Sequence, residues 1–292
     1  MENERYAILD RNGKNDVHWT AMLHNKGTFY MFYNFGMASS GPAPYMTGLA
    51  ISQDGIDFKI EKDVVFGPEV NKWDGNMMEV HSIIRANSTW RMYYCGLDDH
   101  WRIGYAESED LKNWKRNPNP ILDIGDKYWE NIHVADPYVI FFKGKYFMYY
   151  MGKGHVWQVG VAISHDGIEW NKYPENPIIM ATEDWCDGCV CLSGVIIYNG
   201  KLLAAVHGYN TKTSKFITKL MSSDNGIHWR YALKDEKEIV IEPGEWSNRG
   251  IVHPDIVATD GKLYIYYTGI KLGIPNEHRV ELVILDDKNL LL

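Results

Sequence analysis

Acidic and imidazole side chains recur beside short apolar runs along this chain. The plainest case is Asp136, which stands with Pro137 at the start of the run Tyr138–Phe142. Carboxylic acids and imidazoles can exchange protons near neutral pH, so several of them in one pocket could perform general acid–base catalysis. The same residue types could instead hold a cation, because carboxylates suit hard metals and imidazoles suit transition metals. The sequence leaves the identity of any metal unknown.

The surroundings of Asp136 repeat. An aromatic pair ends a strand-like run at Phe32-Tyr33, Tyr93-Tyr94, Tyr149-Tyr150 and Tyr266-Tyr267, and Ala205-Val206 takes its place in one copy. Successive pairs are 61, 56, 56 and 61 residues apart. A second marker is Ser-x-Asp-Gly, with Leu111 replacing Gly in one copy and Asn225 replacing Asp in another. Each copy ends in an aromatic residue, at Phe58, Trp114, Trp170 and Trp229. Because two independent markers keep one period, we infer five repeats.

Each repeat has the pattern of four short strands separated by turns. In the third copy, we expect strands over Val134–Phe142, Lys145–Met151 and Gln158–Ser164, a turn at Asp166-Gly167, and a last strand around Trp170. There is no convincing long amphipathic helix. The pattern predicts an all-β protein, a five-bladed β-propeller whose four-stranded antiparallel blades surround a central channel.

One propeller domain is expected to span residues 1–292. Its blades would lie at about 11–70, 71–127, 128–183, 184–244 and 245–292, with residues 1–10 closing the last blade. The Ser-x-Asp-Gly copies are interpreted as scaffold, because Asp and Gly make the turn and Ser satisfies backbone groups. Their near-identity in four blades supports a structural role.

The first strand of each blade should line the channel, and period-two alternation selects the side chains that face it. Counting back from the following hairpin places these residues level with Asp136: His18, Glu79, His253 and, in blade four, Leu192 or Cys191. Level with Tyr138 are Thr20, His81, Asp255 and Ser193 or Gly194. One end of the channel should therefore gather Asp16, His18, Glu79, His81, His133, Asp136, Tyr138, His253 and Asp255. A single Asp-Pro is more often a turn feature, but ionisable residues that vary on a repeated framework favour a pocket.

A second series consists of Trp73, Trp129, Trp185 and Trp246, each shortly before a first strand. Packing between blades accounts for most of them. Trp129 is the candidate for stacking on a sugar, because the apolar face of a sugar ring suits an aromatic plane.

Composition limits the partners and the setting. The net charge of -8 and the lack of a basic run argue against nucleic acid. No apolar run approaches the roughly 18–20 residues of a membrane helix, and Met1–Arg5 does not resemble a signal peptide. We therefore expect a cytoplasmic protein with four reduced cysteines, since Cys186-x-x-Cys189 lacks partner ligands at an obvious spacing. Oligomeric state is not indicated.

With these residues in view, the chain resembles the five-bladed β-propeller glycoside hydrolases of families 43 and 32, and more faintly those of families 117 and 130. The phrases that carry the resemblance are Ala135-Asp136-Pro137, His24–Tyr33 and Ser108–Trp114. Val206-His207-Gly208 is similar to a phrase in the phosphorylase-rich family 130. The resemblance implies carboxylate chemistry, in which one group delivers a proton to the leaving oxygen and others stabilise an oxocarbenium-like centre.

The family pattern implies an Asp in blade one, an Asp in blade three and a Glu in blade four. Asp136 matches the third-blade Asp, and Asp16 is the first-blade candidate. Blade four departs from the pattern, because Cys191-Leu192-Ser193-Gly194 stands where the Glu is expected and the nearest carboxylate is Asp187. Glu79 is one alternative acid, and a histidine is another, as the likeness to family 117 allows.

We expect an exo-acting glycosidase for a short oligosaccharide or glycoside, with a carbohydrate as its partner. No cofactor is required, although a channel-bound cation such as calcium is an alternative. In this interpretation Asp136 orients the sugar, Asp16 or Asp255 activates water, and Glu79 donates the proton. The expected substrate-binding residues are His18, His81, His133, Tyr138, Asp187, His253 and Trp129. Two alternatives are a non-catalytic carbohydrate-binding propeller, which the missing blade-four Glu favours, and a glycoside phosphorylase.

Overall fold

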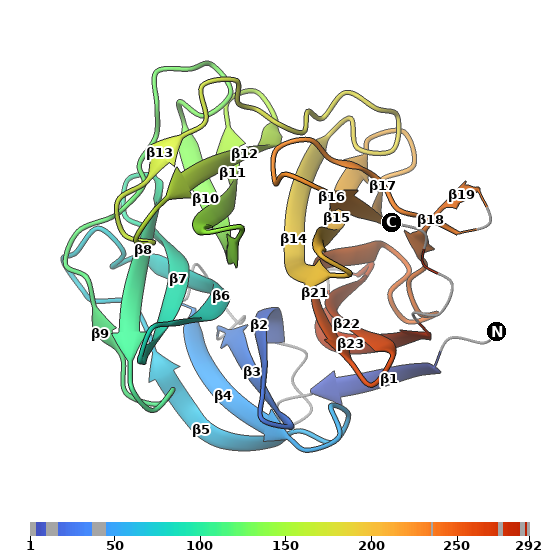
Figure 1. Ribbon diagram of the computed structural model, residues 1–292, viewed down its shortest axis with the longest axis horizontal. Helices are drawn as coiled ribbons and strands as arrows, with labels where there is room; N and C mark the ends of the chain where they lie inside the picture. The colour runs from blue at the N-terminus through green and yellow to red at the C-terminus, as the bar shows by residue number, and fades with distance from the viewer. Residues whose placement is uncertain are drawn as a thin grey trace.

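The computed structural model describes residues 4–9, 17–36, 45–234, 236–273, 277–286 and 290. These residues form strands and no α-helix, so they contain no helix that could cross a membrane. Five blades surround a central channel, as Figure 1 shows. The predicted all-β, five-bladed propeller is confirmed.

Each blade is an antiparallel sheet. Blade one contains β2 (Val17–Asn25), β3 (Thr28–Phe35), β4 (Met46–Ser52) and β5 (Lys59–Phe66). Blade two contains β6 (Met77–Ala86), β7 (Thr89–Leu97), β8 (Trp101–Ser108) and β9 (Lys115–Arg116). Blade three contains β10 (His133–Phe142), β11 (Lys145–Lys153), β12 (Trp157–Ser164) and β13 (Asn171–Lys172). Blade four contains β14 (Cys189–Tyr198), β15 (Lys201–Asn210), β16 (Lys215–Ser223) and β17 (Arg230–Tyr231).

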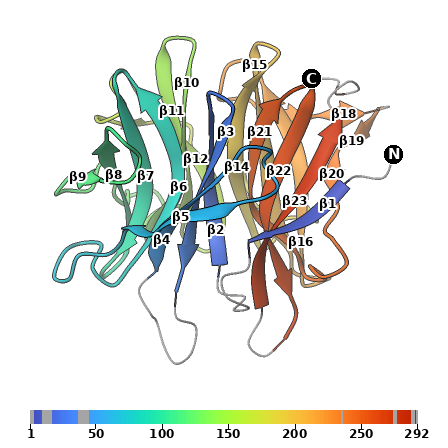
Figure 2. The ribbon, with the colours of Figure 1, turned by 90° about the horizontal axis from the view of Figure 1, so that it is seen from below.

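Blade five combines the two ends of the described chain. It contains β21 (Gly250–Thr259), β22 (Lys262–Lys271) and β23 (Glu277–Asp286), and β1 (Glu4–Leu9) pairs antiparallel with β23 as the outer strand. Figure 2 shows β1 lying across that blade. Three short strands follow blade four: β18 (Leu233–Lys234) pairs with β19 (Lys237–Glu238), and β20 (Val240–Ile241) pairs with β16.

The two sequence markers contact each other across blade boundaries. In blade three, Asp166 Oδ1 accepts the N–H groups of Ile168 and Glu169, at 2.8 and 2.9 Å, and so closes the turn. The hydroxyl of Tyr93, from the aromatic pair of blade two, donates to the carbonyl of Gly167 in that turn at 2.8 Å. The same bond joins Tyr149 to Gly226 and Tyr266 to Gly55, at 2.9 and 2.7 Å. The markers therefore recur together because they join neighbouring blades.

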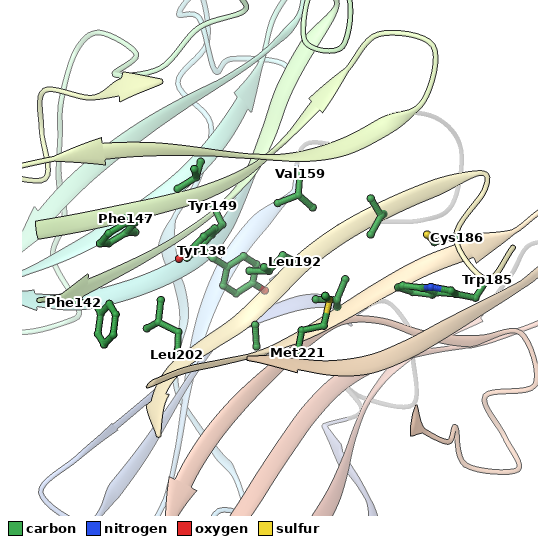
Figure 3. Packing of buried hydrophobic residues seen from close by; sticks show 14 residues of the cluster. Tyr138, Phe142, Phe147, Tyr149, Val159, Trp185, Cys186, Leu192, Leu202 and Met221 are labelled. Carbon is green, nitrogen blue, oxygen red and sulfur yellow. The ribbon is translucent and has the colours of Figure 1, made fainter. Parts of the chain in front are cut away.

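The tryptophans that precede the first strands belong to this scaffold. Trp129 is 1% exposed and its ring centroid lies 5.7 Å from that of Tyr150. Its indole fills the space above Gly152 and Gly160, where any side chain would collide with it. Trp185 occupies the cluster between blades three and four, which Figure 3 shows. The expectation that Trp129 stacks on a sugar is therefore wrong, because the blade interface already covers both faces of its ring.

Every innermost strand has a register shift, where one or two residues leave the ladder. The shifts fall between Val17 and Thr20, Val80 and Ser82, Ala135 and Tyr138, Ser193 and Ile196, and Val252 and Asp255. Such bulges re-aim side chains. Asp136 and His253 have left-handed backbones there, with φ of 53° and 46°. In blade two, Val80 and His81, not Glu79, occupy the place of Asp136 and Pro137. The shift of blade four comes later along the strand, so Leu192 stays level with Asp136, as predicted.

Candidate functional site

The channel holds a cavity at each end. The first, of about 260 Å³, is lined by Trp19, Glu79, Trp101, Ala135, Asp136, Met151, Trp157, Cys189, His207, Phe216, Val252, His253 and Ile270. The second, of about 380 Å³, has largely aliphatic walls, with His81, Ser82, Tyr138 and Asp255 among its polar members. We take the first as the candidate active site, because it combines carboxylates and imidazoles with exposed aromatic rings.

Two carboxylates meet one imidazole at the floor of this cavity. Oδ1 of Asp136 lies 3.3 Å from Nε2 of His81, and Oε2 of Glu79 lies 3.6 Å from the same nitrogen. Asp136 and Glu79 are each 8% exposed, and His81 is fully buried. The bulge in β10 turns Asp136 into the channel, while β6 contributes both Glu79 and His81. The two carboxylates therefore share one partner on the same part of the floor.

This arrangement shifts the proton affinities of the site. Burial raises the pKa of Asp136 to about 6, and the charge of Glu79 adds to the rise while that of His81 opposes it. Burial alone would lower the pKa of His81, but Asp136 and Glu79 outweigh it and raise the pKa above the ordinary value. The two carboxylates therefore favour the charged form of His81, and burial favours a protonated Asp136.

The opposite wall presents two neutral imidazoles and a thiol. Nδ1 of His253 lies 3.7 Å from Oδ2 of Asp136, and the Cys191 thiol donates to the same oxygen at 3.9 Å. Burial lowers the pKa of His207 to about 3. Burial, His207 and His81 lower the pKa of His253 well below its ordinary value. Both rings are therefore neutral.

His207 was missed as a site residue. It lies on β15, the second strand of its blade, directly opposite Cys191 in the ladder. Alternation along the first strands, which predicts channel residues, does not reach a side chain of the second strand. The signal was present in the phrase Val206-His207-Gly208, which was used only as a family likeness.

Two groups of described side chains bring donor atoms within 4.8 Å of one another. One group is Cys191, His207 and His253, and the other is Glu79, His81, Cys95 and Asp136. Calcium prefers a shell of about six to eight oxygen atoms. Thiols and imidazoles are donors that suit zinc-like ions instead. A calcium-type cation therefore does not fit the donors that the channel presents.

Asp255 and Tyr138 line the second cavity, not the first. The two oxygens of Asp255 accept the backbone N–H groups of Met22 and Ile256, at 2.6 and 3.0 Å. Burial raises the pKa of Asp255 to about 7. Since His81 lies between the cavities, the expectation that Asp255 activates water beside Asp136 does not fit the structure.

The remaining candidates lie around the cavity or away from it. His18 packs between the rings of Tyr45 and His278, with centroid distances of 4.8 and 4.9 Å, and burial lowers its pKa to about 3. His133 stacks behind Trp157. Asp187 accepts the backbone N–H and the hydroxyl of Thr211, at 2.7 and 2.6 Å, and so fastens a hairpin of blade four. Asp16 lies outside the described residues.

Comparison with known proteins gives a consistent family. The model of glycoside hydrolase family 130, described as β-1,4-mannooligosaccharide phosphorylase, matches residues 17–187 and 99–234, two overlapping segments that together span most of the chain. A 1,2-β-oligomannan phosphorylase of Thermoanaerobacter sp. (strain X514) is 26% identical over 280 residues, which cover 86% of this chain and 85% of that protein.

Solved structures agree in fold. The β-1,2-mannobiose phosphorylase of Listeria innocua, in complex with β-1,2-mannobiose, has a TM-score of 0.73 at 11% identity and covers 98% of this chain and 97% of its own. A second structure comes from a study of family 130. That study describes a family of mannoside phosphorylases that contains glycoside hydrolases targeting β-1,2 mannosidic linkages in Candida mannan. The structure has a TM-score of 0.71 at 19% identity, and the match covers 94% of this chain and 85% of that one. The comparisons therefore support the resemblance to family 130, which is the fainter one in the sequence. They do not show families 43 and 32.

Proposed function

Because the chain belongs to glycoside hydrolase family 130, we propose that it cleaves β-linked mannosides by transferring a mannosyl unit to inorganic phosphate. The observation that carries the proposal is the shared contact of Asp136 and Glu79 with one nitrogen of His81. The curated relative with phosphorylase activity on 1,2-β-oligomannan supports the substrate class.

The contact with His81 limits how the two carboxylates can act. In hydrolases that invert the anomeric centre, acid and base stand about 6.5–9.5 Å apart with water between them, and in retaining enzymes about 5–5.5 Å apart. Here the nearest donor oxygens lie within 4.8 Å of each other, and the His81 imidazole lies against both. This separation is shorter than the spacing at which an inverting hydrolase holds a water between its acid and its base. One acid without an opposed base suits phosphorolysis, because phosphate supplies its own nucleophilic oxygen.

In the proposed step, the carboxyl proton of Asp136 passes to the glycosidic oxygen as the bond from that oxygen to C1 breaks. An oxygen of hydrogen phosphate bonds to C1, and the phosphate proton returns the Asp136 carboxylate to its acid form. The products are mannose 1-phosphate and the shortened sugar. Glu79 and the cation of His81 set the charge around Asp136, and its raised pKa of about 6 keeps the proton available.

Cations stand behind the aromatic lining, where they could attract phosphate. Lys153 Nζ lies 5.2 Å from the ring centroid of Trp157, and the Arg249 guanidinium lies 5.8 Å from that of Phe216. Both rings line the cavity. Positive side chains at a cavity mouth raise the local concentration of an anionic substrate.

Hydrolysis is the second candidate, and one observation favours it. Among the described residues that line the cavity there is no Lys or Arg, while Glu79 and Asp136 contribute negative charge. Phosphate binding normally uses Arg or Lys in direct contact. A hydrolase would use water from the cavity as the acceptor.

The test is product analysis with β-1,2- and β-1,4-mannobiose, each with and without inorganic phosphate. Phosphorolysis predicts mannose 1-phosphate and free mannose in equal amounts, formed only when phosphate is present. Free mannose at the same rate without phosphate would replace the proposal with hydrolysis. Binding of the sugars without any product would indicate a carbohydrate-binding propeller.

A further inference from the structure

In every blade an aromatic or imidazole ring stands at the same place, at or near the start of the third strand. The second residue of each aromatic pair, or Val206 in blade four, has one ladder partner on the third strand of its blade. From blade one to blade five these partners are Gly48, Gly104, Gly160, Lys219 and Glu281. Three residues before each partner stand Tyr45, Trp101, Trp157, Phe216 and His278, which we call the crown. The crown lies at or near the start of the third strand of each blade. It therefore surrounds the end of the channel that holds Asp136.

The crown is divided into two parts. Trp101, Trp157 and Phe216 line the cavity. Tyr45 and His278 instead pack against His18, with ring centroids 4.8 and 4.9 Å away. The crown rings that line the cavity thus come from blades two, three and four, which are consecutive in Figure 1.

Exposure separates these rings from the scaffold tryptophans. Trp101 and Trp157 are partly exposed, whereas Trp129 is 1% exposed. A repeated position usually indicates scaffold, but a scaffold ring has both faces covered. An indole with a free face beside carboxylates is a suitable surface for the C–H face of a sugar.

His133 holds the two indoles together. Its Nδ1 accepts the backbone N–H of Trp101 at 3.2 Å, and its ring stacks on Trp157 with a centroid distance of 5.8 Å and an interplanar angle of 18°. The neighbours of Trp101 are also fixed, since His100 contacts Asp123 at 2.7 Å and Arg102 contacts both Asp99 and Asp123. Rings that are fixed before binding lose little freedom on binding. His133 is therefore a positioning residue, which differs from its expected direct contact with substrate.

We propose that Trp101 and Trp157 bind the second and third sugar rings of a β-linked manno-oligosaccharide, the part that leaves after cleavage. The proposal rests on the proposed function only for the position of the first ring, which sits at the floor with Asp136 and Glu79. The leaving sugars then extend over blades two and three, away from His18.

The test measures binding, not turnover. Mannose, β-1,2-mannobiose and β-1,2-mannotriose are titrated by calorimetry into wild-type protein and into the variants Trp101→Ala, Trp157→Ala and Trp157→Phe. Phe141→Ala is the matched control, because Phe141 is a 50% exposed ring near the opposite end of β10. Melting temperatures of all variants establish that they are folded.

We expect each Ala variant to bind mannotriose about tenfold more weakly, a typical scale for the loss of one ring contact, and to bind mannose as the wild type does. Trp157→Phe should recover most of the loss, and Phe141→Ala should match the wild type. Equal losses for mannose and mannotriose would overturn the proposal, as would unchanged mannotriose binding or a wild type that binds none of the sugars. The binding pattern without turnover would refute the proposed function and leave this inference standing.

Discussion

Nε2 of His81 lies 3.3 Å from Oδ1 of Asp136, and this contact joins the ionisation of the two residues. His81 is fully buried, and the carboxylates around it raise its pKa and so favour its charged form. Burial of Asp136 raises the pKa of its carboxyl group and favours the neutral form, whereas the charge of His81 lowers that pKa. The balance leaves a carboxylic acid that can release its proton near neutral pH, which is the property required of a general acid.

Activity should depend on the protonation of Asp136. Its pKa is raised to about 6, so kcat should fall as pH rises through that value. The charge of Glu79 contributes to the rise, so Glu79→Gln should move the decline to lower pH. The measurement is kcat against pH for both proteins at saturating phosphate. A decline that stays at the same pH in Glu79→Gln would contradict the assigned coupling.

Asp136→Asn should lower kcat by about 10²- to 10⁴-fold, the usual contribution of a positioned acid. KM should change little, because the amide retains the shape of the side chain. Asp255→Asn is the matched control, because Asp255 is also 8% exposed but lines the other cavity. Comparable kcat losses in the two folded variants would place the chemistry elsewhere.

Much of the fold could be predicted from the sequence, because the aromatic pairs and the Ser-x-Asp-Gly turns join blade to blade and therefore recur at one period. The bulges could not be predicted. An extra residue reverses the alternation that assigns side chains to faces. Asp136 and Asp255 were consequently expected in one pocket, although they face different cavities. Trp129 and Trp157 are equally aromatic in the sequence, and only packing against Gly152 and Gly160 makes Trp129 structural.

The turn of blade three should be sensitive to acid, whereas that of blade four should not. Backbone N–H groups of Ile168 and Glu169 lower the pKa of Asp166 below 3.8, while Asn225 makes the same bonds without ionising. A lowered pKa stabilises the fold above the unfolded value and loses that contribution as pH falls through the folded value. Asp166→Asn should therefore lower Tm at neutral pH, by an amount that shrinks below about pH 4. A difference in Tm that is constant with pH would refute this.

Trp129→Ala should destabilise the protein by about 3–5 kcal/mol, the usual cost of removing a large buried side chain. The indole is 1% exposed and fills the space over two glycines, so its loss leaves a cavity. Urea unfolding followed by circular dichroism measures the change. Unaltered stability together with weakened sugar binding would restore Trp129 as a substrate contact.

The most direct test of phosphorolysis by this protein is the fate of phosphate during cleavage of β-1,2-mannobiose. Inorganic phosphate and mannose 1-phosphate are followed together by ³¹P NMR, with wild-type protein and with Asp136→Asn. Phosphorolysis with Asp136 as the acid predicts one mannose 1-phosphate for each bond cleaved by the wild type, no cleavage without phosphate, and little product from Asp136→Asn. Cleavage that leaves inorganic phosphate unchanged, or a fully active Asp136→Asn, would contradict it.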